Sequence, residues 1–118
     1  MATDFYDMDG NPISVQQWGR LRDGTGPHIG STMVGHWWVS TVWLGLNHRV
    51  FGLGPPIIFE TMVFYRGKDK VERPWLDEYM QRYATKEEAL AGHEAVVSMV
   101  EVTENLTRSI VEEQFKQQ

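Results

Sequence analysis

The stretch from Val39 to His48 constrains the fold more than any other part of this chain. It reads Val-Ser-Thr-Val-Trp-Leu-Gly-Leu-Asn-His, so β-branched and aromatic residues lead to a glycine and then to two polar residues. That composition is typical of a strand that ends in a polar loop. Successive side chains of a strand point to opposite faces, and both faces of the run from Trp37 to Leu46 are largely apolar. We therefore predict a central strand that is covered on both sides, by a helix on one side and by a subunit or loops on the other.

Three further runs suit strands around this one. The predicted meander consists of residues 28–34, 37–46, 57–65 and 76–83. Gly35-His36 separates the first two runs and suits a tight hairpin turn. Glu60 is the only charged residue of the third run. In the fourth run, alternation places Tyr79, Gln81 and Tyr83 on one face.

Two capping boxes predict where helices begin. In Ser14-Val-Gln-Gln17, the serine hydroxyl and the glutamine side chain can each satisfy a backbone N–H of the other residue. We expect a short helix over residues 15–22 that turns Val15, Trp18 and Leu21 inward.

The second box, Thr85-Lys-Glu-Glu88, predicts a helix from residue 86 to at least 102. No Gly or Pro follows Gly92, so the pattern allows this helix to continue to about residue 116. One apolar stripe runs along it: Ala89, His93, Val96, Val100, Thr103, Leu106 and Ile110. Such a helix overhangs a small sheet, and an overhang that exposes Leu106, Ile110, Val111 and Phe115 calls for a partner such as a second copy.

The predicted fold class is α+β. An antiparallel meander of about four strands carries a short N-terminal helix, and a long C-terminal helix packs across the sheet. The 118 residues suit one domain, with a core over about residues 6–102 and a helical extension over 103–118.

Composition narrows the classes of function. Eleven basic residues against 16 acidic ones give a net charge of −5, which argues against a protein that coats nucleic acid. The absence of Cys excludes a disulfide framework and a cysteine nucleophile. The acidic start lacks an apolar signal region and no run is long enough for a membrane helix, so we expect a cytoplasmic protein.

Several motifs together resemble one known family. They are Tyr6-Asp-x-x-Gly-x-Pro-Ile13, Ser40-Thr-Val-Trp-Leu-Gly-Leu-Asn-His48, Gly54-Pro-Pro-Ile-Ile-Phe-Glu-Thr-Met-Val-Phe64 and Arg82-Tyr-x-Thr-x-x-Glu-Ala-x-x-Gly-His-Glu94. The chain resembles, over roughly residues 6–97, a family of small proteins encoded by bacteriophages and prophages, particularly those of actinobacteria. The resemblance implies a phage protein in the cytoplasm of an infected bacterium and implies no particular activity. The family usually carries Asp where this chain has Asn47, so the resemblance does not support a role that needs a carboxylate there.

Three polar residues near the strand ends are candidates for a site. His48 follows the central strand and titrates near neutrality, so it could contact a ligand or transfer a proton, or it could simply bond the backbone of its loop. Glu60 could act as a general base or accept a bond from a ligand. Alternatively, Glu60 forms a structural ion pair with Arg82 on the next strand.

His93 and the tryptophans can be interpreted as core residues as well as functional ones. A lone histidine on an apolar helix face is more often a core residue than a ligand. Preceding it, Gly92 suggests that something packs closely against the helix there. Trp37, Trp38 and Trp43 could stack on a base, although core packing explains them as well. The spacing of His48, Glu60 and His93 gives no support to a metal site, and we expect neither a metal nor another cofactor.

The leading hypothesis is a non-enzymatic phage accessory protein that acts by binding. It would sequester a small nucleotide-like ligand or block a host protein, such as a defence protein. The residues expected to bind the ligand are Trp43, Asn47, His48, Arg49, Glu60, Arg82 and His93. The alternatives are a small hydrolase or lyase that uses His48 and Glu60, and a purely structural oligomer assembled through the C-terminal helix.

Overall fold

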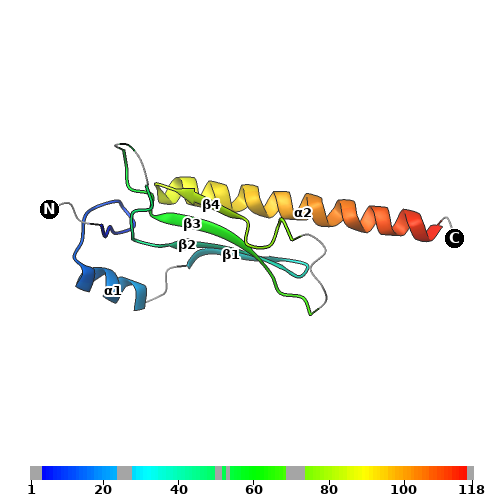
Figure 1. The fold of residues 1–118 in the computed structure, drawn as a ribbon, viewed down its shortest axis with the longest axis horizontal. Helices are drawn as coiled ribbons and strands as arrows, with labels where there is room; N and C mark the ends of the chain where they lie inside the picture. The colour runs from blue at the N-terminus through cyan, green and yellow to red at the C-terminus, as the bar shows by residue number, and fades with distance from the viewer. Residues whose placement is uncertain (1–3, 24–27, 50–51, 53, 69–73, 117–118) are drawn as a thin grey trace.

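A long helix lies across one face of a four-stranded antiparallel sheet (Figure 1). The computed structural model describes residues 4–23, 28–49, 52, 54–68 and 74–116. Its elements are α1 (Val15–Asp23), β1 (His28–Val34), β2 (Trp37–Trp43), β3 (Phe59–Tyr65), β4 (Met80–Tyr83) and α2 (Lys86–Lys116). The sheet order is β1-β2-β3-β4, which confirms the predicted α+β class and the meander.

The strand register sorts the side chains onto two faces. Thr41 of β2 pairs with Thr61 of β3, which pairs with Gln81 of β4. One residue further along the ladder, Val42 pairs with Glu60. The first set faces α2 and the second faces away, because paired residues of antiparallel strands point to the same side.

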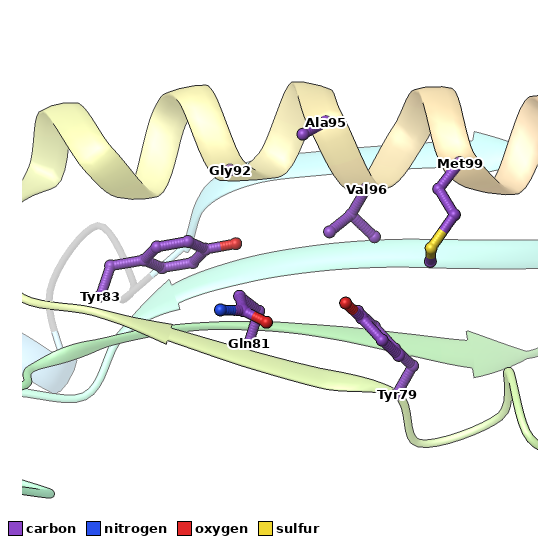
Figure 2. A pocket seen from close by; sticks show the side chains of 7 residues that line it. All are labelled: Tyr79, Gln81, Tyr83, Gly92, Ala95, Val96 and Met99. Carbon is purple, nitrogen blue, oxygen red and sulfur yellow. The ribbon is translucent and has the colours of Figure 1, made fainter.

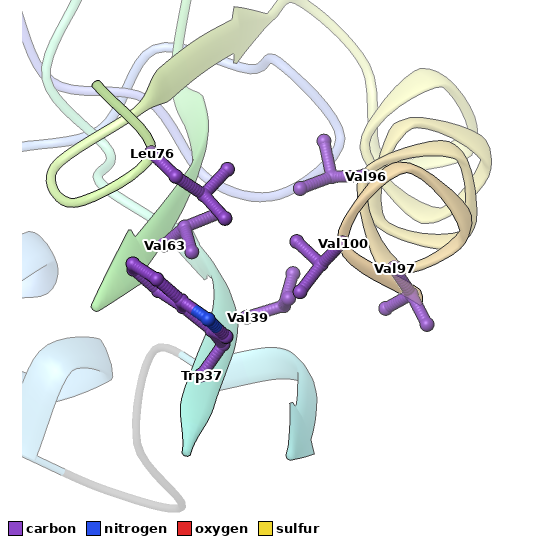
Figure 3. Close-up of a cluster of buried hydrophobic side chains, with 7 residues drawn as sticks. All are labelled: Trp37, Val39, Val63, Leu76, Val96, Val97 and Val100. Atoms are coloured by element: carbon purple, nitrogen blue, oxygen red, sulfur yellow. The ribbon is translucent and has the colours of Figure 1, made fainter. Parts of the chain in front are cut away.

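Helix α2 supplies most of the apolar surface that covers the sheet. The predicted stripe is buried at Ala89, His93, Val96 and Val100, and Val97 joins it. Two clusters result, one of Trp37, Val39, Val63 and Leu76 against Val96, Val97 and Val100 (Figure 3), and one of Trp43, Ile58, Phe59 and Tyr83 against Ala89.

The helix runs to Lys116 and extends well past the sheet, as the absence of helix breakers after Gly92 suggested. Leu106 on this extension is exposed, as expected. The side chains of Ile110, Val111 and Phe115 lie outside the described part of the chain.

Helix α1 occupies a different place from the one that its pattern suggests. Both bonds of its capping box are present, since Gln17 N donates to the Ser14 hydroxyl and Ser14 N donates to the Gln17 side chain. Val15 and Leu21, however, are about half exposed, so the prediction that they turn inward is wrong. Two side chains anchor the helix to the end of β2. The Trp18 indole Nε1 donates to Leu44 O at 2.9 Å, and the Arg22 guanidinium donates to Trp43 O and Leu44 O at 3.2 and 3.3 Å.

Strand β1 has its predicted bounds, whereas the other three strands are shorter than predicted, and β3 begins at Phe59 instead of at residue 57. β2 stops at Trp43 because Gly45 adopts a φ of +72° and packs against the rings of Trp18 and Trp43. β4 begins only at Met80, because a turn closed by Tyr79 N and Leu76 O precedes it and buries Leu76.

Strand β2 lies between β1 and β3, as predicted for a central strand, and α2 covers one of its faces. On the other face Ser40 is buried and Trp38 and Val42 are half-buried, and no described helix packs there, so cover by a subunit or loops stays a prediction.

Gly92 allows a side chain of the sheet to pack closely against α2, as its position in the sequence suggested. A methyl group at this residue would overlap the ring of Tyr83 from β4. We expect Gly92→Ala to lower the free energy of unfolding by about 1–2 kcal/mol, because overpacking exceeds the roughly 1 kcal/mol gained in helix propensity. Urea denaturation followed by tryptophan fluorescence measures this change.

Gly19 of α1 provides the matched control, because nothing lies within 4 Å of a methyl group placed there. We expect Gly19→Ala to raise the free energy of unfolding by up to about 1 kcal/mol. Equal stabilisation by both substitutions would contradict the close contact between Tyr83 and Gly92.

Candidate functional site

The face of the sheet opposite α2 is the candidate site, and we call it the open face. Its side chains are His28, Ser31 and Met33 of β1, Trp38, Ser40 and Val42 of β2, Glu60, Met62 and Phe64 of β3, and Met80 and Arg82 of β4. A shallow groove of about 230 Å³ runs over it between His28 and Phe64. No described helix packs on this face, so its apolar residues remain partly accessible.

Aromatic rings form one end of the open face. The ring centroids of Trp38 and Phe64 lie 5.4 Å apart on neighbouring strands. The guanidinium of Arg66 lies 4.5 Å from the Trp38 ring and 5.9 Å from the Phe64 ring. Trp38 also donates from Nε1 to the Ser31 hydroxyl at 2.8 Å, which holds its indole in place. This end is therefore apolar, ordered and capped by a cation.

An ion pair forms the other end. Arg82 Nε donates to Glu60 Oε2 at 3.0 Å, and the two residues are cross-strand partners in the ladder. The ion pair with Arg82, which we gave as the structural alternative for Glu60, is therefore present. Because Arg82 is partly exposed, the pair contributes orientation of both side chains more than stability.

His48 lies within electrostatic reach of this ion pair. Partial burial lowers the pKa of His48 and the positive charge of Arg82 lowers it further, while Glu60 opposes both effects. The imidazole is therefore neutral at pH 7. The structure thus brings together His48, Glu60 and Arg82, which come from one loop and two neighbouring strands.

The neighbours of His48 maintain the shape of their own loop. Asn47 Oδ1 accepts hydrogen bonds from Arg49 N at 3.0 Å and from Ile57 N at 2.9 Å. The Arg49 guanidinium donates from Nε to Pro55 O at 3.1 Å and packs against Gly54. Both side chains that we predicted to bind a ligand are therefore engaged in holding the loop.

Two other predicted residues lie on the side of the sheet that faces α2. Trp43 is only 1% exposed and belongs to the core, so its ring faces are not available for stacking on a base. His93 is buried, and its two ring nitrogens hydrogen-bond with the hydroxyls of Thr41 and Thr32 at 2.7 and 2.9 Å. The sheet separates His93 from Glu60, so His48, Glu60 and His93 do not come together as the ligands of one metal site.

Sequence reasoning missed much of the open face. His28, Met62, Phe64 and Arg66 were not among the candidates, and Trp38 was considered only as a stacking residue. The strand alternation already placed Trp38 and Phe64 on the side opposite Trp37 and Val63. These residues were overlooked because we expected a subunit or loops to cover the second face of β2.

Comparison with known proteins assigns no role to the site, so its geometry alone supports the argument. No family model, curated protein or solved structure matches the chain. Among the described residues, no group of three or more His, Asp or Glu side chains is arranged to hold a metal ion. None of the described helices is long and apolar enough to cross a membrane.

The two bonds to Asn47 Oδ1 give a prediction for that position. An aspartate oxygen can accept the same two N–H groups, whereas alanine leaves them without an acceptor. We expect Asn47→Asp to change the free energy of unfolding by less than about 1 kcal/mol, and Asn47→Ala to lower it by about 1–3 kcal/mol. Urea denaturation of both variants checks this. Equal losses of stability in the two variants would show that the amide nitrogen of Asn47, which makes neither of these bonds, is the group that stabilises the loop.

The buried His93 predicts a loss of stability in mild acid. Burial lowers its pKa in the folded protein, with Glu94 opposing the shift. Below about pH 6.5 the unfolded chain binds a proton that the folded chain does not, so stability falls as pH drops through this range. We expect a slope of up to about 1.4 kcal/mol per pH unit, measured by urea denaturation between pH 7.5 and 5.

Substitution of His93 tests whether this residue causes the dependence of stability on pH. His93→Gln removes the titrating group, so stability should depend less on pH even though the variant is less stable at every pH. His36→Gln, in the exposed β1–β2 turn, serves as the control and should keep the slope. An unchanged slope in His93→Gln would assign the acid sensitivity to other groups, of which His48 is the next to test.

Proposed function

We propose that this chain is a bacteriophage accessory protein that acts by binding, and that its open face docks on a protein of the infected cell. The observation that carries the proposal is the uncovered sheet face, on which Trp38, Phe64 and Met80 remain accessible. Soluble proteins rarely leave an ordered apolar face without a partner. The composition of the face, with Trp, Phe, Met and Arg, matches that of the central part of protein interfaces.

The charges around the face define the chemistry of the partner. Arg66 lies over the aromatic end, and Arg82 stands at the other end with its charge partly offset by Glu60. A complementary surface is apolar in the middle and carries carboxylates at the matching edges. The family resemblance supports placing this partner, for example a defence protein, in the cytoplasm of the bacterial host.

The geometry favours a protein over a small nucleotide-like ligand. A groove of about 230 Å³ is smaller than most sites that enclose a ligand of that size. Trp43 and Arg49, two of the residues expected to bind the ligand, are engaged in the core and in the loop. An open, shallow face suits a broad protein contact better.

A hydrolase or lyase activity is the second candidate, because His48 lies within electrostatic reach of Glu60 and Arg82. A neutral imidazole beside a carboxylate can accept a proton from a bound substrate. Any such activity should disappear in His48→Gln, in which the side chain remains polar but cannot act as a base near neutral pH.

Substitution on the open face tests the binding proposal. Met80 on β4 and Leu90 on α2 are both 43% exposed, but only Met80 lies on the open face. We expect Met80→Glu to weaken a host protein contact at least about tenfold, because it buries a charge in an apolar interface. Leu90→Glu should leave the contact intact. Co-purification of all three forms from infected cells, followed by titration of the recovered protein, makes the comparison.

The pattern across the three forms decides the outcome. A protein retained by the wild type and by Leu90→Glu, and lost with Met80→Glu, supports docking through the open face. Equal recovery by all three would place the contact elsewhere. Native mass spectrometry of the same preparations reports any small molecule that is retained, and a nucleotide-sized mass would overturn the choice of a protein partner.

A further inference from the structure

Helix α2 carries a second apolar stripe that does not face the sheet. It consists of Gly92, Ala95, Met99, Val102 and Leu106, spaced alternately by three and four residues. This is the spacing with which two helices pack side by side. We call these five residues the seam.

The seam is exposed toward its C-terminal end and borders a groove toward its N-terminal end. Val102 and Leu106 are 57% and 60% exposed. Gly92, Ala95 and Met99 line a groove of about 370 Å³, whose opposite wall is formed by Tyr79, Gln81 and Tyr83 of the sheet (Figure 2). The groove thus continues along α2 into the exposed apolar stripe toward the C-terminus.

The two ends of the seam differ in residue size. Gly92 and Ala95 at one end are small, whereas Val102 and Leu106 at the other end are large. Two copies of α2 that run antiparallel, with Met99 at the centre, place Leu106 level with Gly92 and Val102 level with residues 95 and 96. Tyr83 already packs on Gly92, so Leu106 and Val102 of one copy meet the groove that Ala95, Met99 and the β4 side chains line on the other. A parallel pair would leave this groove empty and set the two Leu106 side chains against each other.

We propose that the seam binds a second copy of this chain, with the two α2 helices antiparallel about a twofold axis at Met99. Leu106 of each copy enters the groove between α2 and β4 of the other. One patch that is complementary to itself is what a twofold dimer requires.

The charges around the seam permit this contact. The positions that flank it are uncharged: Ala91, Val96, Ser98, Thr103 and Asn105. The acidic residues Glu94 and Glu101 lie one position further from the contact. Two copies of a chain with a net charge of −5 can therefore meet along this stripe without placing like charges in direct contact.

The dimer is compatible with the proposed function and does not depend on it. Helix α2 lies on one side of the sheet and the open face lies on the other (Figure 1). Pairing through the seam leaves both open faces free, so the assembly would present two docking surfaces and bind multivalent partners with increased avidity.

Sedimentation equilibrium of the full chain tests the assembly. We expect the wild type and Leu90→Glu to be dimers at about 10 µM, and Leu106→Glu to be a monomer, because each dimer would bury two carboxylates in an apolar contact. Leu106 is exposed in the single chain, so its replacement should not affect folding, which circular dichroism can verify. A wild-type monomer at every concentration, or a dimer that Leu106→Glu does not disturb, would overturn the proposal.

Crosslinking tests the orientation of the helices, because the chain has no natural Cys. In the antiparallel pair, residue 99 meets its counterpart at the axis, while the two copies of residue 106 are about 21 Å apart along the helices. Met99→Cys should therefore give a covalent dimer with a short thiol crosslinker, and Leu106→Cys should not. Efficient crosslinking at residue 106 would show a parallel pair and refute the arrangement.

Discussion

The contact between α2 and the sheet holds the rest of the structure together. A four-stranded meander has little stability until one of its faces is covered, and α2 is the only described helix that packs on it. One stripe of the helix buries Ala89, Val96 and Val100 against the strands. Near the middle of this contact, His93 hydrogen-bonds with threonines of both β1 and β2, which fixes the helix over those strands.

That single contact also explains why two apolar surfaces remain accessible. A helix presents only one stripe to a sheet, so no described helix covers the far face of the sheet or the seam of α2. Helix α1 lies at the end of β2 instead of over the far face, because the Trp18 indole and the Arg22 guanidinium both donate to backbone carbonyls there. The described part of the chain therefore presents apolar surfaces on both sides of its two buried clusters, and these are the surfaces to which we assign the two proposed contacts.

Parts of the fold and of the site could be predicted because they depend on local chemistry. The capping boxes at Ser14 and Thr85 fixed the helix starts, and the Gly35-His36 turn fixed the β1–β2 hairpin. The Glu60–Arg82 pair followed from two neighbouring strands with opposite charges. The same reasoning failed for Val15 and Leu21, because periodicity identifies an apolar stripe without saying whether anything packs on it.

The sequence by itself determined the order of the elements, their approximate bounds and the close approach at Gly92, since propensity, capping and steric size act over a few residues. Only the tertiary structure decided which side of the sheet each candidate occupies. Trp43 lies beneath α2 and the His93 side chain points from α2 toward the sheet, whereas Glu60 lies on the open face, because a sheet has two sides and a single long helix can cover only one of them.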